Sequence, residues 1–410
     1  MELVENRYQI QGLDVLTICQ EFGTPLYLYD GNKIEQKIHY LKQCFAHTDM
    51  QIKYACKALT SLAILQLMKK NGVGLDTVSI QEVQLGLMAG FEPHEILFTP
   101  NCVDFAEIQE AVQLGVTINI DNISILEQFG ATYGNTVPCC IRLNPHLTAG
   151  GNTKIQVGHI DSKFGISILQ LRHVHRIVQA NHILVKGLHV HTGSDILESE
   201  IFLRSAEIIF EAAYEFKDLT FIDFGSGFKV PYKETDIQTD IADLGLKLGE
   251  AFESFCQQYG RKLAIWFEPG KYLVSEAGYL LVKANTIKQT PSTVFVGVNS
   301  GMNHLIRPAL YNAYHQIQNI SNPTGVKRLY SVVGYICETD TLGWDRKLNE
   351  VREGDILAIK NAGAYGYVMS SNYNSRLRPA EVLIYQNKVY LIRKRETLED
   401  LIRNQIPLFS

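Results

Sequence analysis

Four strand-like apolar runs of this chain end at residues that can do chemistry. The run YACK ends at Lys57, HVHTGS carries His189 and His191, DFGSGF places two glycines around Ser226, and WFEPGK carries Glu268. A lysine amine can form a Schiff base with an aldehyde, and a carboxylate can pair with a protonated ring nitrogen that then withdraws electrons. An imidazole can stack on a flat ring, and glycine amides can approach an anion closely. Together these groups predict a site for an anionic aromatic cofactor.

Each of these signals is weak by itself. Most lysines are solvated surface charges, Gly225-Ser226-Gly227 could be a plain tight turn, and Glu268 could form an internal salt bridge. Residues two apart on a strand share a face, so only one histidine needs to meet the cofactor and the other could be a hydrogen-bonded interior residue. Ser194, which begins the loop after the histidines, could donate to a phosphate. The prediction therefore depends on the fold bringing the groups together.

The elements that must position these residues alternate along the chain. Between about residues 50 and 270, amphipathic helix-like segments separate eight short apolar runs: IKYAC, VGLDTVS, EILFTP, VTINI, CCIRL, KGLHVH, FIDFG and AIWFEP. This alternation is typical of parallel strands, and eight such units fit a closed (β/α)8 barrel of the TIM type. An open doubly wound sheet is the alternative. In a barrel the carboxyl ends of the strands meet on one face, which would gather the four groups.

The pattern changes after about residue 275. Strand-like runs are joined there by polar turns, Gln386-Asn387-Lys388 is typical of a hairpin turn, and the segment from Leu305 to Ile317 is helix-like. We therefore expect an α/β protein with two domains. A (β/α)8 barrel would occupy residues 28–274, and residues 1–27 with 275–410 would form a mostly β domain.

Composition excludes several classes of function. The chain of 410 residues carries a net charge of −5 with acids and bases interspersed, and no basic block indicates nucleic acid or a membrane surface as a partner. Its polar, acidic start lacks the apolar core of a signal peptide. The eight cysteines lack metal-site spacing, so we expect reduced thiols, a cytoplasmic protein and no metal.

Lys57, His191, Gly225 to Gly227 and Glu268 together describe a pocket for pyridoxal 5′-phosphate. With these residues in place, the chain resembles the fold-type III pyridoxal-phosphate decarboxylases, the alanine-racemase-like barrel group, and most of all their diaminopimelate decarboxylase family. The resemblance runs over nearly the whole length. Its most specific pieces are NAGAYGYVMSSNYNSRLRPAEVLI, from Asn361 to Ile384, and CETD, from Cys337 to Asp340.

The resemblance implies a role for each residue of the cofactor pocket. Lys57 would carry the cofactor, His191 would stack on its ring, and Glu268 would hold the ring nitrogen. Asp76, at another strand end, matches a family acid near the lysine. The implied phosphate contacts are Ser194, Gly225, Ser226, Gly227 and Tyr365.

The resemblance also implies substrate contacts and a shared site. Arg307 and Tyr311, in IRPALY, would meet the distal end of the substrate, with Lys271 and Tyr365 as further contacts. Cys337 and Glu338 would reach into the site of a partner subunit, so the working unit would be a homodimer with shared active sites. The implied catalytic residues are Lys57, Cys337, Glu268 and His191.

Several positions depart from the commoner family pattern. YACKAL replaces a motif with valine before the lysine and asparagine two residues after it, HTGS replaces a form with isoleucine or valine after the histidine, and Gly225-Ser226-Gly227 replaces three glycines. EPGK replaces EPGR. Arginine grips an anion with two parallel hydrogen bonds, whereas Lys271 offers a point charge, so the contact of Lys271 stays open.

The implied reaction is decarboxylation of meso-2,6-diaminopimelate to L-lysine and carbon dioxide, the last step of lysine biosynthesis. The distal carboxylate of that substrate suits Arg307, and its distal ammonium suits Glu338. Cys337 or Lys57 would take part in returning a proton to the α-carbon. Decarboxylation of ornithine, arginine or carboxynorspermidine is the nearest alternative, followed by an amino-acid racemase and a non-catalytic homologue.

Overall fold

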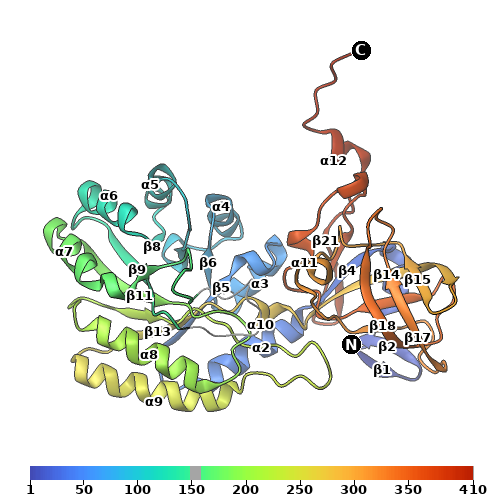
Figure 1. Ribbon diagram of the computed structural model, residues 1–410, viewed down its shortest axis with the longest axis horizontal. Helices are drawn as coiled ribbons and strands as arrows, with labels where there is room; N and C mark the ends of the chain where they lie inside the picture. Colours follow the sequence, from blue (N-terminus) through green and yellow to red (C-terminus); the bar gives the residue numbers. More distant parts are fainter. Residues whose placement is uncertain (148–157, 410) are drawn as a thin grey trace. The chain divides into compact units, whose positions relative to one another are not determined.

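The computed structural model describes residues 1–147 and 158–409 (Figure 1). The chain divides into two compact units. The first, called the β unit below, contains Met1–Glu35, Pro231–Asp236 and Leu273–Ser410. The second, the barrel unit, contains Gln36–Val230 and Ile237–Tyr272.

Parallel strands of the barrel unit form a closed ring. In ring order they are β5 (Met50–Ala55), β6 (Gly74–Thr77), β7 (Ile96–Phe98), β8 (Thr117–Ile120), β9 (Pro138–Asn144), β11 (Leu184–Val190), β12 (Phe221–Asp223) and β13 (Ala264–Phe267). Parallel pairing of β13 with β5 closes the ring, and the short β10 (Ile166–Ser167) pairs with β9 beside it. Each ring strand coincides with one apolar run of the sequence, so the predicted (β/α)8 barrel is confirmed.

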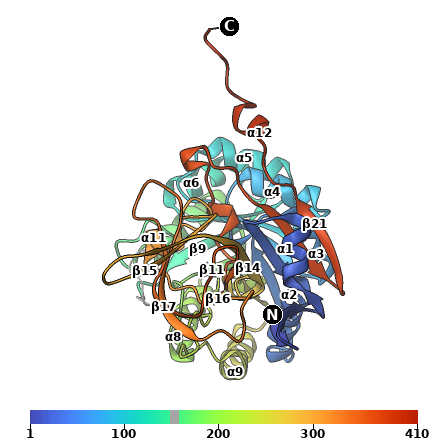
Figure 2. The ribbon, with the colours of Figure 1, turned by 90° about the vertical axis from the view of Figure 1, so that its right-hand side faces the viewer.

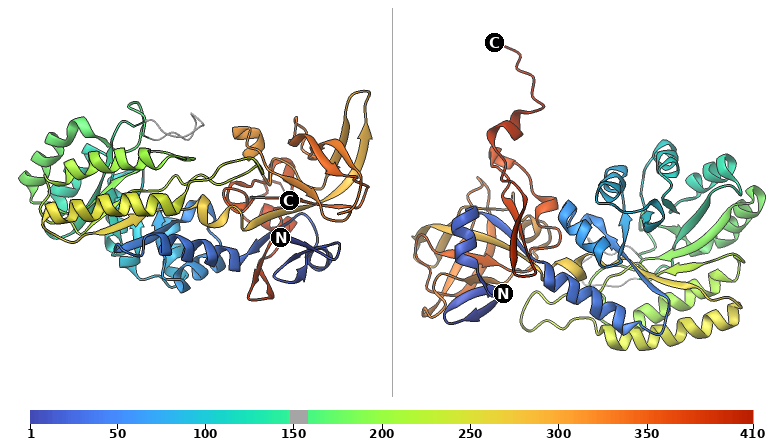
Figure 3. Two further views of the ribbon diagram at one scale, coloured as in Figure 1. Left: turned by 90° about the horizontal axis from the view of Figure 1, so that it is seen from below. Right: turned by 180° about the vertical axis from the view of Figure 1, so that it is seen from behind.

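Helices cover the outside of the ring (Figure 1). They are α2 (Gly31–Cys44), α3 (Leu62–Lys70), α4 (Ile80–Met88), α5 (Phe105–Gln113), α6 (Ile123–Tyr133), α7 (Leu171–Asn181), α8 (Ser199–Ala213) and α9 (Ile241–Tyr259). α8 and α9 lie side by side (Figure 3). The sequence sets their ends: Asp240 caps α9 by accepting hydrogen bonds from two amides of its first turn, and Gly260 ends α9 in the left-handed conformation.

Toward the amino ends of the strands the barrel interior holds apolar rings, with the buried Lys53 against Trp266, and toward their carboxyl ends it is polar. Phe221 and Trp266 stack in the apolar part with ring centroids 3.6 Å apart. Gly187 lies beside them, where a Cβ atom would overlap the ring of Phe221. The buried polar side chains above this core are Asp76, Asn119, Arg142, His189, Asp223 and Glu268. Buried polar groups need partners, so this half of the barrel is where a site is expected.

The β unit combines strands from both ends of the chain in one sheet (Figure 2). The order is β18 (Thr341–Asn349), β17 (Lys327–Val333), β15 (Val294–Val298), β14 (Gly278–Gln289), β4 (Leu26–Asp30), β20 (Ala380–Tyr385) and β21 (Lys388–Arg393). β19 (Ile356–Ile359) pairs with β14 and with β16 (Ile317–Asn319). The β unit also contains a separate small sheet of β1 (Glu2–Val4), β2 (Arg7–Ile10) and β3 (Leu13–Asp14), and the helices α1 (Val15–Phe22), α11 (Arg307–Tyr311) and α12 (Leu398–Ile402). The helix α10 (Lys271–Val274) contains the boundary at which the chain passes from the barrel unit to the β unit. The second, mostly β part of the predicted fold is therefore confirmed.

Two local predictions for this unit have different outcomes. The predicted hairpin joins β20 to β21, and its turn residues Gln386 and Asn387 have φ of +50° and +59°, as a tight primed turn requires. A helix over residues 305–317 is wrong beyond Tyr311. Asn312 adopts the left-handed conformation and ends α11, and Ile317 begins β16. None of the helices in the described part of the chain is long and apolar enough to cross a membrane.

Candidate active site

Lys57 and Asp76 stand at the carboxyl ends of the neighbouring strands β5 and β6. Lys57 lies in a short 3-10 turn directly after β5, and its Nζ is 3.5 Å from Oδ2 of Asp76. Asp76 is buried. Burial and the negative charge of Glu268 raise the pKa of Asp76 to about 7, against the attraction of Lys57. A carboxyl with that pKa can exchange a proton beside the amine near neutral pH.

His191 follows β11 and faces the glycine turn after β12. The amide of Ser226 donates a hydrogen bond to Nδ1 of His191 over 3.2 Å. Burial and the positive charge of Arg142 lower the pKa of His191 to about 3. The imidazole is therefore neutral at physiological pH, and the hydrogen bond fixes its plane, which suits a ring that stacks on a flat cofactor.

The turn Gly225-Ser226-Gly227 needs glycine at its first and last positions. Gly225 and Gly227 have φ of +60° and +112°. A Cβ atom on Gly225 would lie 2.6 Å from Nδ1 of His191, and one on Gly227 would overlap the carbonyl oxygen of Gly193. Ser226 is not in this left-handed region, which explains why serine is tolerated in the middle. Backbone is thus left bare at the mouth of the barrel, as phosphate binding requires.

Glu268 lies one residue after β13 and is 8% exposed, while His189 on β11 is 1% exposed. Nε2 of His189 is 3.2 Å from Oε2 of Glu268. Burial raises the pKa of Glu268, but the pairing with His189 and the positive charge of Lys57 outweigh it and bring the pKa to about 2. The carboxylate is therefore ionised. Its other oxygen, Oε1, is buried and has no hydrogen-bond partner among the described residues.

These features fit pyridoxal phosphate. A protonated pyridine nitrogen would supply the partner that Oε1 of Glu268 lacks, and an unpaired buried carboxylate oxygen is otherwise costly. Lys57 offers the amine for the aldehyde, His191 offers a neutral ring, and the turn of Gly225 and Gly227 offers backbone for the phosphate. The structure brings these residues, which were predicted from strand ends, to one rim of one barrel.

Lys271 makes a contact that the sequence did not predict. Its Nζ donates to Oγ of Ser194 over 3.1 Å and forms a close ion pair with Asp195. The side chain of Lys271 is only 10% exposed, so its charge interacts mainly with Asp195 and little with solvent. Asp195 has a φ of +62°. Its position directly after Ser194 was the only feature of the sequence that could have indicated its contact with Lys271.

The remaining predicted residues belong to the β unit. Arg307 and Tyr311 lie on α11. The guanidinium carbon of Arg307 is 5.3 Å from the ring centre of Tyr232 and 5.9 Å from that of Tyr311. Its Nε is buried without a hydrogen-bond partner among the described residues. Tyr365 has a φ of +54°.

Cys337 and Glu338 lie on the connection between β17 and β18 and are exposed. The amide of Asn374 donates to Sγ of Cys337 over 3.2 Å, and the hydroxyl of Tyr373 donates to Glu338 over 2.9 Å. Asp340, the last residue of CETD, is buried and accepts from the amide of Ile336 over 3.0 Å. It shapes the turn that leaves the thiol and the carboxylate on the surface.

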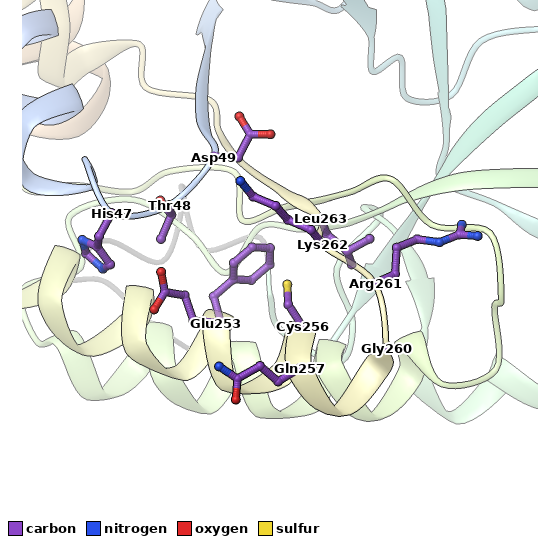
Figure 4. A pocket seen from close by; sticks show the side chains of 11 residues that line it. His47, Thr48, Asp49, Glu253, Cys256, Gln257, Gly260, Arg261, Lys262 and Leu263 are labelled. Atoms are coloured by element: carbon purple, nitrogen blue, oxygen red, sulfur yellow. The ribbon is translucent and has the colours of Figure 1, made fainter.

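A pocket of about 590 Å³ lies elsewhere on the barrel unit (Figure 4). It is formed by the segment before β5, the carboxyl end of α9 and the segment before β13, so it opens at the amino ends of the strands. Its lining includes His47, Asp49, Glu253, Cys256, Arg261 and Lys262. None of the strand-end groups described above lines it.

The sequence analysis missed three buried residues of the barrel interior as parts of the site. They are Asp223, Arg142, and His189 in its role as the neighbour of Glu268. The spacing His-x-His was a signal for His189, because it places both rings on one face of β11. Asp223 precedes the glycine turn, and its Oδ1 accepts from the amide of Gly225 over 2.8 Å. No signal in the sequence distinguished Arg142 from an ordinary strand residue.

A barrel with a lysine, an anionic carboxylate and a glycine turn at its carboxyl rim defines the class of pyridoxal-dependent enzymes on this fold. Residues 31–275 match the family model described as pyridoxal-dependent decarboxylase, pyridoxal binding domain. A diaminopimelate decarboxylase from Methanothermobacter thermautotrophicus is 39% identical, over 97% of this chain and 95% of that protein. The chain belongs to the diaminopimelate decarboxylase family.

Solved structures agree with this assignment. Diaminopimelate decarboxylase from Helicobacter pylori, complexed with L-lysine, has a TM-score of 0.88 and 33% identity, covering 95% of this chain and 98% of that one. The enzyme from Methanocaldococcus jannaschii in complex with L-lysine has a TM-score of 0.90 and 32% identity, covering 99% of this chain and 98% of the other. The expected family and cofactor are confirmed.

Proposed function

We propose that this chain decarboxylates meso-2,6-diaminopimelate to L-lysine and carbon dioxide, the last step of lysine biosynthesis. The single observation that carries the chemistry is the buried Glu268 carboxylate, ionised by its surroundings and with one oxygen unpaired. Membership of the diaminopimelate decarboxylase family supports the choice of substrate.

Each barrel residue has a proposed task. Bound pyridoxal phosphate supplies an aldehyde that condenses with amines and a protonated ring that accepts the electron pair left when carbon dioxide departs. Lys57 holds the cofactor and gives way to the amine of the substrate, with Asp76 beside it as a proton exchanger. His191 keeps the ring flat against one side. Glu268 holds a proton on the ring nitrogen, because an adjacent negative charge raises the pKa of that nitrogen.

The phosphate contacts in this proposal are the amides around Gly225, Ser226 and Gly227, with Ser194 and Tyr365. The position of Ser194 beside Lys271 supports a cationic environment for the anion. Because Lys271 is also paired with Asp195, it adds less net charge than an arginine with no acidic neighbour would.

Substrate recognition is assigned to the residues that the family resemblance implies. Arg307 and Tyr311 would bind the distal carboxylate, and Glu338 the distal ammonium, with Lys271 and Tyr365 as further contacts. The buried, unpaired Nε of Arg307 supports this role, because a cationic N–H donor without an acceptor can bind an anion. In this proposal residues 28–274 form the cofactor-binding barrel, and residues 1–27 with 275–410 contribute substrate and dimer contacts.

The proposed working unit is a homodimer in which Cys337 and Glu338 act in the site of the partner subunit. Their exposure on the β unit supports this, since a catalytic thiol needs a site around it. Cys337 or Lys57 then returns a proton to the α-carbon after the bond to the carboxylate has broken.

The substrate is tested by measuring carbon dioxide release from purified holoenzyme with meso-diaminopimelate, ornithine, arginine and carboxynorspermidine. We expect rapid turnover of diaminopimelate alone, because only that substrate offers a distal carboxylate together with an ammonium. Turnover of ornithine together with no turnover of diaminopimelate would refute the proposed substrate. Racemisation of alanine or serine, followed by chiral chromatography, would indicate the racemase alternative.

The role of Lys57 is tested by Lys57→Ala, which should abolish both turnover and the visible absorbance of the cofactor bound through that lysine. Lys69→Ala is the matched control, because Lys69 also pairs with a carboxylate, Glu95 at 2.9 Å, on the outside of the barrel. An unchanged spectrum in Lys57→Ala would reject the assignment.

A further inference from the structure

His189, Asp223 and Glu268 form a buried cluster beneath the carboxyl rim of the barrel. One nitrogen or oxygen atom from each of the three side chains lies within 4.8 Å of the others. All three are almost completely buried. Only Glu268 is assigned a direct contact with the cofactor, so the other two residues need an explanation.

The barrel register brings the three side chains together. His189 on β11 pairs with Asp223 on β12, and Asp223 pairs with Trp266 on β13. Glu268 lies two residues after Trp266, so its side chain points to the same inner face. The backbone links them further: the amide of Gly225 donates to Asp223 over 2.8 Å, and the amide of Glu268 donates to the carbonyl of Gly225 over 2.5 Å.

The two carboxylate oxygens of Glu268 have different surroundings. His189 Nε2 lies 3.2 Å from Oε2, whereas Oε1 has no hydrogen-bond partner among the described residues. Both ring nitrogens of His189 are buried, and neither forms a complete hydrogen bond with the described residues, although Nε2 is the nitrogen that faces Glu268. Burial lowers the pKa of His189, so the ring is neutral and carries one proton. We assign that proton to Nε2, because Nε2 is the ring nitrogen that faces a carboxylate oxygen.

Asp223 does not compete as a second anion. Its side chain is completely buried, and burial followed by the negative charge of Glu268 raises its pKa well above the usual range. The titratable groups that face the cluster are Arg142 from β9, Asp76 from β6, Lys57 after β5 and His191, whose ring is neutral. Among the three members of the cluster, the negative charge therefore resides on Glu268.

We propose that His189 is a positioning residue: it donates its Nε2 proton to Oε2 of Glu268, which keeps that carboxylate ionised and turns Oε1 toward the ring nitrogen of the cofactor. This rests on the proposed function, because it assigns the ring nitrogen to Glu268. Without the donor, a carboxylate in this buried place takes up a proton or rotates, and either change weakens its hold on the ring nitrogen.

The test uses holoenzymes reconstituted with pyridoxal phosphate carrying ¹⁵N in its ring. In His189→Leu the donor is gone. We expect the ¹⁵N chemical shift to move toward that of an unprotonated pyridine, and kcat to fall about 10- to 100-fold, as when supporting partners of site ligands are removed. KM should change much less. His189→Gln keeps a neutral N–H donor, so it should restore most of the ¹⁵N shift and of kcat.

His175→Leu is the matched control, since the partly buried His175 of α7 also lies near a carboxylate, 3.4 Å from Glu215, but outside the barrel interior; it should leave both readouts unchanged. A wild-type ¹⁵N shift in His189→Leu would overturn the proposal even if activity were lost. If His189→Leu does not fold, a strongly displaced shift in the folded His189→Gln variant, with no rescue, would also overturn it. The comparison of ¹⁵N shifts does not depend on the substrate. Failure of the wild type to decarboxylate diaminopimelate would refute the proposed function, whereas the ¹⁵N shift would still test whether His189 positions Glu268.

Discussion

At the scale of single residues, Glu268→Gln separates binding from chemistry. Glutamine has nearly the same shape but no charge, so it can occupy the place of Glu268 without holding a proton on the ring nitrogen. We expect kcat to fall about 10²- to 10³-fold, because the benefit of the charge grows as electrons enter the ring. The dissociation constant of the cofactor, measured by absorbance titration, should change far less. Equal losses in kcat and in cofactor affinity would indicate a mainly structural role.

Arg307→Ala tests the assignment of the distal carboxylate. The buried Nε of Arg307 has no hydrogen-bond partner in the described residues, and a charged hydrogen bond is worth about 1.5–3 kcal/mol. We therefore expect the KM for diaminopimelate to rise about 10- to 100-fold, with a smaller change in kcat. Arg328→Ala is the control, since Arg328 pairs with Glu350 at 3.3 Å on the surface. Unchanged steady-state kinetics in Arg307→Ala would remove this residue from the substrate pocket.

Residue types and their place at strand ends were enough to predict Lys57, His191 and Glu268 as neighbours in a barrel rim. The contacts between individual side chains within that rim could not be predicted from the sequence. The pair of Lys271 with Asp195 depends on a loop in which Asp195 adopts a φ of +62°. The contact of His189 with Glu268 depends on the register between strands far apart in the chain, which no local pattern encodes.

At the scale of elements, periodicity predicted the barrel strands well because each run is apolar, short and bounded by turn residues. The same reasoning failed at α11. Its sequence continues with helix-compatible residues, but Asn312 takes the left-handed conformation and the chain then enters β16. Sheet pairing of Ile317 with Ile359 outweighs the local helical preference.

His304 connects elements of the β unit and makes their stability depend on pH. Its Nε2 donates to the carbonyl of Leu377 over 3.0 Å and Nδ1 accepts from Ser300 over 3.0 Å. Its own carbonyl accepts from Tyr27 of β4 over 2.6 Å. Burial lowers the pKa of His304 to about 4, although the bond to Leu377 opposes this. In the unfolded chain the ring titrates near 6.5, so between these values the unfolded state binds more protons.

The stabilisation from neutral His304 is therefore complete above about pH 6.5 and is lost as the pH falls toward 4. We predict that the free energy of unfolding of the wild type, relative to His304→Gln, decreases by about 2–3 kcal/mol between pH 7 and pH 4.5. Urea unfolding of both proteins at several pH values, followed by circular dichroism, measures this difference. A difference that does not vary with pH would mean that the ring titrates in the folded protein as it does in the unfolded chain.

At the scale of the whole molecule, the proposed sharing of sites between subunits can be tested by mixing inactive variants. Lys57→Ala lacks the amine, and Cys337→Ala lacks the thiol that would act across the interface. If each site takes Lys57 from one subunit and Cys337 from the other, a mixed dimer has one site with both defects and one intact site. Random exchange makes half of the dimers mixed, so activity should recover to about a quarter of the wild-type value. Steady-state decarboxylation after mixing and re-equilibration measures the recovery.

The matched control mixes Lys57→Ala with Glu268→Gln. Both residues stand at the rim of one barrel, so each mixed dimer would carry one defect in each site and no activity should return. Native mass spectrometry establishes that subunits exchange in both mixtures. If exchange occurs and the mixture of Lys57→Ala with Cys337→Ala stays inactive, Cys337 does not complete the site of the partner. The exposed thiol held by Asn374 would then need a role other than proton return at the α-carbon.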